Sequence, residues 1–171
     1  EKIGAHEMGY YMAAVYVATS FLILIEPVNK VFAPWIFKSL KSGNHILVKR
    51  YIKIYCLGLS VFGVFFILVG LLIFDKLVPL EYSEAKAILP YLICGCLFQG
   101  FYYCRVNILF YFEKNHLISF MSITVLVINL VLTILLTTMF GVTGAAISFL
   151  AVNFLMYLSS HYASHRELSL V

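Results

Sequence analysis

The sequence predicts an all-α membrane protein, a polytopic bundle of transmembrane helices. Three observations lead to this fold class. The chain has 171 residues, of which 63% are hydrophobic and only 12% charged; its mean hydropathy is +0.97; and stretches such as 54–74 contain no charged residue at all. A soluble domain of this length needs more charge on its surface, so the composition indicates an integral membrane protein.

Five segments are long enough to cross a bilayer as helices. The hydrocarbon core is about 30 Å thick, so one helix needs roughly 20 mainly apolar residues. The connections are short and contain no low-complexity linker. The sequence therefore predicts a single domain over residues 1–171, with five spans at about 10–37, 54–74, 87–112, 117–140 and 142–160.

The first two predicted spans differ in polarity. The first, 10–37, contains Glu26, Pro27, Lys30 and Pro34. Each proline removes a backbone hydrogen bond, so we expect this helix to be bent or locally opened. The second span, 54–74, has no charged residue.

The remaining three spans follow with little sequence between them. The third, 87–112, is apolar apart from Arg105. The last two are separated by almost no loop. Gly141 can close one helix, and Gly144 allows close backbone approach in the next. The sequence therefore predicts a tight hairpin of helices at the end of the chain.

The distribution of basic residues predicts the orientation in the membrane. The net charge of +4 does not indicate nucleic-acid binding, because five basic residues lie in one short stretch without acids: Lys38, Lys41, Lys49, Arg50 and Lys53. Such a stretch is typical of a cytoplasmic loop. Alternation then places the N-terminal end outside and the C-terminus inside. An odd number of spans that starts outside, and a first residue other than Met, suggest a piece of a longer protein.

Three ionisable residues lie within the predicted spans. Glu26 and Lys30 are four residues apart on one helix face, and Arg105 falls at a similar depth. An ionised side chain at the bilayer centre costs about 2.5–3.5 kcal/mol, so these residues predict a polar cavity or an ion-pair network. Two interpretations stay open: Glu26 pairs structurally with Lys30 or Arg105, or these residues contact a substrate or coupling ion. Lys30 could also snorkel to the cytoplasmic surface.

Amides also lie near the middle of three predicted spans. Asn129 and Asn153 are expected to form hydrogen bonds between helices, each worth roughly 0.6 kcal/mol. Gln99 shares a helix face with Tyr102 and Tyr103. An amide and aromatic face suits sugar hydroxyls and apolar ring surfaces, but it suits plain packing equally well.

Catalytic and metal-binding patterns are not found in the sequence. All four cysteines lie within predicted spans, where packing is the expected role: Cys56, Cys94, Cys96 and Cys104. His161 and His165 have a spacing that could ligate a metal on a helix, but no third ligand is nearby, and we expect them to be interfacial. Glycine-rich phosphate loops and catalytic triads are absent. We therefore expect no enzyme activity, catalytic residue, metal or cofactor.

Four motifs resemble those of polysaccharide-export flippases. Residues 9–14 (GYYMAA) and 33–38 (APWIFK) resemble the two ends of the eighth helix of that family. Residues 128–132 (INLVL) and 140–147 (FGVTGAAI) resemble its paired final helices. The similarity covers essentially the whole chain. It points to the multidrug/oligosaccharidyl-lipid/polysaccharide (MOP) exporter superfamily, and within it to the repeat-unit flippases of O-antigen or capsule (Wzx type).

The resemblance implies a fold and a function. The chain would form helices 8–12 of a twelve-helix protein, as the C-terminal lobe, in the bacterial inner (cytoplasmic) membrane with its C-terminus cytoplasmic. The whole protein would flip an undecaprenyl-pyrophosphate-linked oligosaccharide to the periplasmic leaflet by alternating access. Its partners would be this lipid-linked oligosaccharide, membrane lipids, an N-terminal lobe and coupling H⁺ or Na⁺.

Site roles for individual residues are hypotheses, because the family offers no invariant short motif for these positions. Substrate binding is assigned to Lys30, Gln99, Tyr102 and Arg105, in which the two cations offset the charge of phosphate. Charge balance or coupling-ion binding is assigned to Glu26.

Three other functions remain as alternatives. One is a different MOP-type exporter, for drugs or lipid precursors. A drug exporter would favour an acidic cavity for organic cations, whereas these spans contain two bases and one acid. The other two are a membrane-embedded polymerase or acyltransferase of the same pathway, and a structural membrane subunit that transports nothing.

Overall fold

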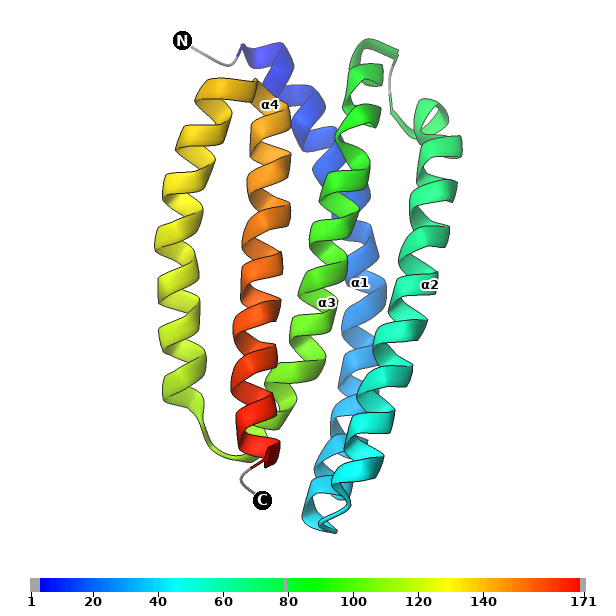
Figure 1. Cartoon of the computed structure of the whole chain (residues 1–171). Coiled ribbons are helices and arrows are strands. Elements are labelled where there is room, and N and C mark those ends of the chain that lie inside the picture. Colours follow the sequence, from blue (N-terminus) through cyan, green and yellow to red (C-terminus); the bar gives the residue numbers. More distant parts are fainter. Residues whose placement is uncertain (1–3, 79, 170–171) are drawn as a thin grey trace.

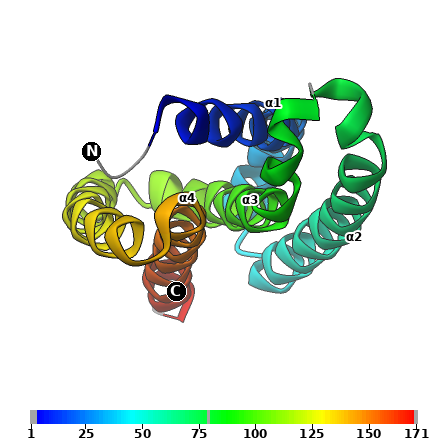
Figure 2. The same cartoon turned by 90° about the horizontal axis from the view of Figure 1, so that it is seen from above.

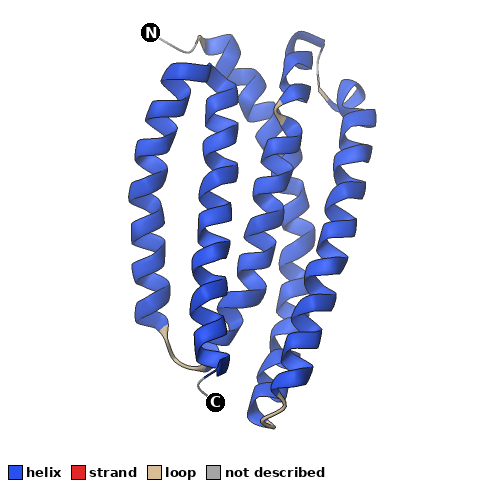
Figure 3. Cartoon of the chain, viewed as in Figure 1, coloured by secondary structure: helices blue, strands red, loops and turns tan. Residues whose placement is uncertain are grey.

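The structure is a bundle of long helices (Figure 1). The computed structural model describes residues 4–78 and 80–169. Within these residues all regular structure is helical and no strand occurs (Figure 3). Four helices are long and apolar enough to cross a membrane. The predicted all-α class is thus confirmed, and the four long apolar helices support a membrane protein, whereas the division into five membrane spans stays a prediction.

The first two helices form an antiparallel pair. Helix α1 (Ala5–Lys41) continues through Pro27 and Pro34 as one helix. A tight turn follows, in which Gly43 has a φ of +68° that glycine adopts without strain. Helix α2 (His45–Leu77) then begins, and the Asn44 side chain caps it by accepting a hydrogen bond from the Leu47 amide at 3.1 Å.

The third helix occupies the centre of the bundle. A short 3₁₀ helix, η1 (Leu80–Ala87), joins α2 to α3 (Leu89–Tyr111). Pro90 lies in the first turn of α3, where its missing N–H costs nothing. Seen from above in Figure 2, α3 lies between α2 and α4, with α1 along one side. It packs most extensively against α4, then against α1 and α2.

The fourth helix is folded back on itself. Helix α4 (Asn115–Ser169) contains one non-helical residue, Gly141, with φ 59° and ψ −136°. Figure 1 shows that the chain reverses there, which gives α4 a first arm before Gly141 and a second arm after it. The predicted helical hairpin is thus present, and it has no loop. Its arms are joined by a hydrogen bond between the Thr133 and Ser148 hydroxyls at 3.0 Å.

Aromatic and aliphatic side chains fill the space between the helices. Phe21 of α1 stacks on Phe62 of α2 with ring centroids 5.3 Å apart, and Phe98 of α3 meets Phe154 of α4 at 5.0 Å. The outward faces are also apolar. Large exposed side chains such as Leu72 line the outside of α2 and the first arm of α4. A soluble protein rarely exposes so much apolar surface, but lipid accommodates it.

The helices extend beyond the apolar segments that the sequence marks. The expected span 54–74 lies within a helix that begins nine residues earlier, and the second arm of α4 continues to Ser169 rather than ending at Ser160. Hydropathy detects only the part of a helix that lies in hydrocarbon, whereas the backbone hydrogen bonds continue into polar ends. As a result, Lys49 and Lys53 belong to α2 and not to a loop.

Candidate basic pocket

A cavity of about 620 Å³ lies between α2, α3 and the second arm of α4. It is near the lower end of the bundle in Figure 1, the end that also holds the connection between α1 and α2 and the end of α4. Three helical segments contribute its walls. The lining residues are Lys49, Ile52, Lys53, Cys56, Leu57 and Ser60 from α2; Phe101 and Arg105 from α3; and Tyr157, His161, His165 and Leu168 from α4.

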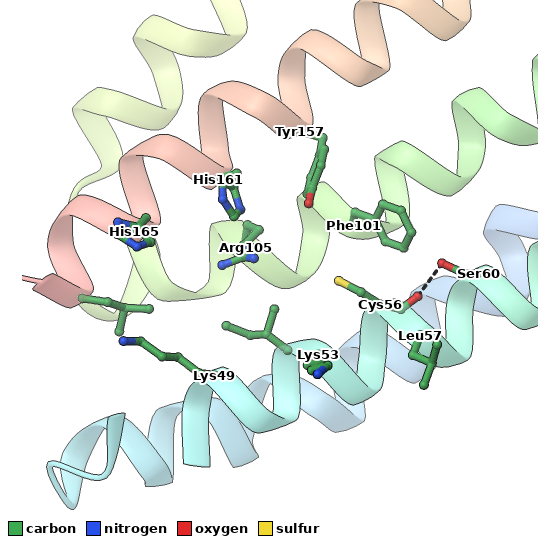
Figure 4. Close-up of a pocket in the computed structure, with 12 residues that line it drawn as sticks. Lys49, Lys53, Cys56, Leu57, Ser60, Phe101, Arg105, Tyr157, His161 and His165 are labelled. Carbon is green, nitrogen blue, oxygen red and sulfur yellow. Dashed lines mark hydrogen bonds between the residues drawn. The ribbon is translucent and has the colours of Figure 1, made fainter. Parts of the chain in front are cut away.

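Regular helical spacing brings these side chains together. Lys49 and Lys53 are one turn apart on α2, and His161 and His165 are one turn apart on α4, so each pair projects from one face. The two histidine rings lie 6.3 Å apart between centroids. Figure 4 shows Arg105 of α3 between the His161 ring and the α2 wall.

The pocket is basic. It contains two lysines, one arginine and two histidines, and no Asp or Glu is among its lining residues. The described ion pair nearest the end of α4 joins Lys114 Nζ to Glu167 Oε2 at 3.6 Å, and neither residue lines the pocket. Cations that share a cavity without an acid repel one another, and an anion that enters relieves this repulsion.

Arg105 has an unused hydrogen-bond donor in this pocket. Its Nε is buried and has no hydrogen-bond partner among the described residues, and the same holds for His161 Nδ1. Arg105 interacts electrostatically with His161 and with Cys56. Leaving a buried donor without a partner costs about 1–3 kcal/mol of stability. A guanidinium pairs best with two oxygens of one carboxylate or phosphate. The arrangement therefore suits an anion.

The upper part of the pocket is apolar. Phe101 and Tyr157 meet there with ring centroids 5.5 Å apart. Ser60 is already engaged, because its hydroxyl donates to the Cys56 carbonyl at 2.8 Å. The charged side chains lie toward the lower end and the apolar ones toward the middle of the bundle. The pocket therefore matches an amphiphile with an anionic head.

Glu26 and Lys30 do not line this pocket. Both are exposed on α1, and Glu26 lies near Tyr103 of α3. The Asn107 amide donates a hydrogen bond to the Asn29 side chain at 3.0 Å, which marks the face of α3 that contacts α1. Arg105 lies two residues earlier, about 200° around the helix, so it points away from α1.

The structure therefore sets Arg105 apart from Glu26 and Lys30, which stay one turn apart on α1. Among the described residues, Glu26 forms an ion pair with neither Lys30 nor Arg105. Of the predicted binding residues, Arg105 alone lies in the basic pocket. Gln99 and Tyr102 instead line a second, smaller cavity with Asn129 and Asn153.

Sequence reasoning missed the four basic residues that line the pocket with Arg105. Lys49 and Lys53 were assigned to a loop, and His161 and His165 to an interfacial position. The signal that could have found them is their repeated spacing of four, which predicts one helix face on each side of Arg105. No third His, Cys, Asp or Glu joins the two histidines as a metal-binding group within the described part of the chain.

Comparisons with protein-family models, with curated proteins and with solved structures find no match to this chain.

Proposed function

We propose that the chain belongs to a membrane transporter that flips a lipid-linked, phosphate-bearing oligosaccharide from the cytoplasmic to the periplasmic leaflet. The substrate class is undecaprenyl-pyrophosphate-linked repeat units of O-antigen or capsule. The observation that carries this proposal is the basic pocket, an acid-free cluster of five basic side chains between three helical segments of an apolar bundle, in which Arg105 and His161 are half-buried and Lys49, Lys53 and His165 are exposed.

The geometry of the pocket supports an amphiphilic phosphate ligand. Moving a pyrophosphate head group across hydrocarbon requires groups that replace its water. Arg105 can bind two phosphate oxygens at once, and Lys49 and Lys53 add point charges. The apolar upper wall suits the first carbons of a lipid tail. A transporter of organic cations would need the opposite charge in its cavity.

The resemblance to the MOP exporters suggests the orientation, the missing lobe and the coupling ion of the proposed transporter. The chain would be the C-terminal lobe, with its lower end cytoplasmic, rocking against an N-terminal lobe and coupled to H⁺ or Na⁺. The lower end carries Lys38, Lys41 and Lys49, which agrees with the cytoplasmic side under the positive-inside rule. The close hairpin of α4 agrees with the paired final helices of that family.

A complementation experiment tests this function. The full-length gene that contains this chain would be expressed in a strain that makes the cognate repeat unit but lacks its flippase, and the surface-polysaccharide ladder would be scored. We expect the wild type to restore the ladder and Arg105→Ala to remove it, because the guanidinium no longer offsets the phosphate charge. Arg105→Lys should restore part of the ladder, since it keeps the charge without the bidentate geometry.

Lys41→Ala is the matched control. Lys41 is an exposed cation at the same end of the bundle, outside the pocket, and its removal should leave the ladder intact. A wild-type protein that reaches the membrane of the native host without restoring the ladder would contradict the proposed function. A ladder that survives Arg105→Ala would keep the flippase and remove the basic pocket from its mechanism.

A further inference from the structure

A second polar cavity lies in the middle of the bundle, apart from the basic pocket. It has a volume of about 280 Å³ and lies between α3 and the two arms of α4. Gln99 is at the centre of α3, and Asn129 and Asn153 lie near the middle of the two arms. The lining residues are Gln99, Tyr102, Ser122, Val125, Leu126, Asn129, Val152, Asn153 and Met156.

Each of the three amides forms its hydrogen bond within its own helical segment. Gln99 Nε2 donates to the Tyr103 hydroxyl at 2.9 Å, Thr133 Oγ1 donates to Asn129 Oδ1 at 3.0 Å, and Asn153 Nδ2 donates to the Phe149 carbonyl at 2.8 Å. All three bonds join residues four apart. The hydrogen bonds between helices expected of Asn129 and Asn153 are therefore not made directly by these amides.

This pattern leaves one polar atom of each amide available to the cavity. Gln99 Oε1 and Asn153 Oδ1 remain as acceptors, and Asn129 Nδ2 remains as a donor; within the described chain none of the three has a hydrogen bond. Amide groups at the centre of a membrane bundle are costly without partners. A ligand or water in the cavity can satisfy them.

The chemistry of the lining defines the class of ligand. None of the lining residues is charged, so the cavity suits a neutral molecule. Acceptors and a donor side by side match hydroxyl groups, which both donate and accept. The Tyr102 ring, Val152 and Met156 offer apolar contacts to C–H groups. At about 280 Å³ the cavity is near the lower end of small-molecule sites, roughly 300–1,000 Å³, so it holds one ring.

We propose that this cavity, the amide pocket, is a binding site for a neutral sugar ring. The site is separate from the basic pocket, because the two cavities share no lining residue. The proposal deepens the proposed function by giving the sugar part of that substrate a site, and its test does not require the basic pocket to bind anything.

Native mass spectrometry of the purified chain from nanodiscs tests the amide pocket. The probe is monoglucosyldiacylglycerol, compared with diacylglycerol of the same acyl chains, which differs only by the sugar. We expect several-fold more adducts with the glycolipid. Asn129→Leu and Gln99→Met keep side-chain size and remove polar atoms. Each should bring the ratio of glycolipid adducts to diacylglycerol adducts close to one. Arg105→Ala, in the other pocket, should leave the ratio unchanged.

Two results would overturn the amide pocket. One is an equal number of adducts with the two lipids in the wild type. This comparison does not depend on whether any variant folds. The other is a glycolipid preference that persists in both amide variants. Methyl glucoside added in excess identifies the source of the ring: displacement of the glycolipid indicates a sugar that enters from water, and retention indicates one that is carried on a lipid. Either result keeps the site.

Discussion

Arg105 is the residue on which the basic pocket depends. Its Nε is buried without a hydrogen-bond partner, and no acid lines the cavity to balance its charge. Arg105 lies in the last two turns of α3, six residues before the helix ends, and ionisable residues inside membrane helices are usually functional. An anion held beside the guanidinium would give this donor a partner and balance its charge. This is the physical reason to expect a ligand with phosphate chemistry.

Asn29 and Asn107 offer a residue-scale prediction about stability. Their side chains form a hydrogen bond between α1 and α3, and Asn107 is only 7% exposed. Hydrogen bonds between membrane helices average about 0.6 kcal/mol and reach about 1.7 kcal/mol. A double-mutant cycle with Asn29→Leu and Asn107→Leu, measured by unfolding in mixed micelles, should give a coupling energy in this range. Additive effects of the two changes would show that the bond does not stabilise the fold.

At the scale of elements, the hairpin of α4 depends on two glycines. Gly141 has a positive φ in a region that other residues rarely adopt. Gly144 lies against the Leu136 carbonyl so closely that no Cβ would fit. Together they allow the second arm to return directly along the first, and so bring His161, His165 and Asn153 to α3.

Gly144→Ala should therefore destabilise the chain. The added methyl meets backbone and not a flexible side chain, so the hairpin must open, at a cost of about 1–3 kcal/mol. The measurement is the midpoint of unfolding by denaturing detergent, followed by circular dichroism. Gly58→Ala is the control, because a Cβ there meets nothing within 4 Å and alanine favours a helix by about 0.5–1 kcal/mol. An equal midpoint for Gly144→Ala and wild type would contradict this account of the hairpin.

The positions of the helices along the chain could be predicted from the sequence, but the direction in which each helix face points could not. Hydropathy located α1, α2, α3 and both arms of α4 but not the short 3₁₀ helix η1, and the glycine pattern 141–144 predicted the hairpin. Depth along a helix follows from residue counts, so Glu26 and Arg105 were placed correctly at similar levels. Which way each side chain points depends on how neighbouring helices pack. Because Asn107 faces α1, Arg105 turns to the opposite side, away from Glu26, and no pattern within a single helix reveals this.

The candidate sites were predictable only in part, because they depend on which way the side chains of neighbouring helices point. Arg105 was identified because a charge in an apolar segment is conspicuous. Lys53 was not, because the basic stretch 38–53 was interpreted as a cytoplasmic loop and not as the beginning of a helix. Gln99 and Tyr102 were paired correctly on one face, but their proximity to Asn129 depends on packing between segments.

The whole molecule combines an apolar exterior with two polar cavities of different chemistry. Exposed side chains on α2 and on the first arm of α4 form the lipid-facing surface. The basic pocket lies toward the lower end, and the amide pocket lies in the middle of the bundle. The two cavities share no lining residue. Such an arrangement is suited to ligands that have both anionic and hydroxyl groups.

Equilibrium binding of labelled undecaprenyl pyrophosphate to the chain in nanodiscs tests the central claim most directly. We predict saturable binding that is at least tenfold tighter than that of undecaprenol, which lacks the phosphates. Arg105→Ala and the double change Lys49→Ala with Lys53→Ala should each weaken binding about tenfold or more, since each removes a charge-assisted contact. Lys41→Ala should bind as the wild type does. Equal affinity for the two lipids, or wild-type affinity in the Arg105→Ala protein, would contradict the assignment of the basic pocket as a phosphate site.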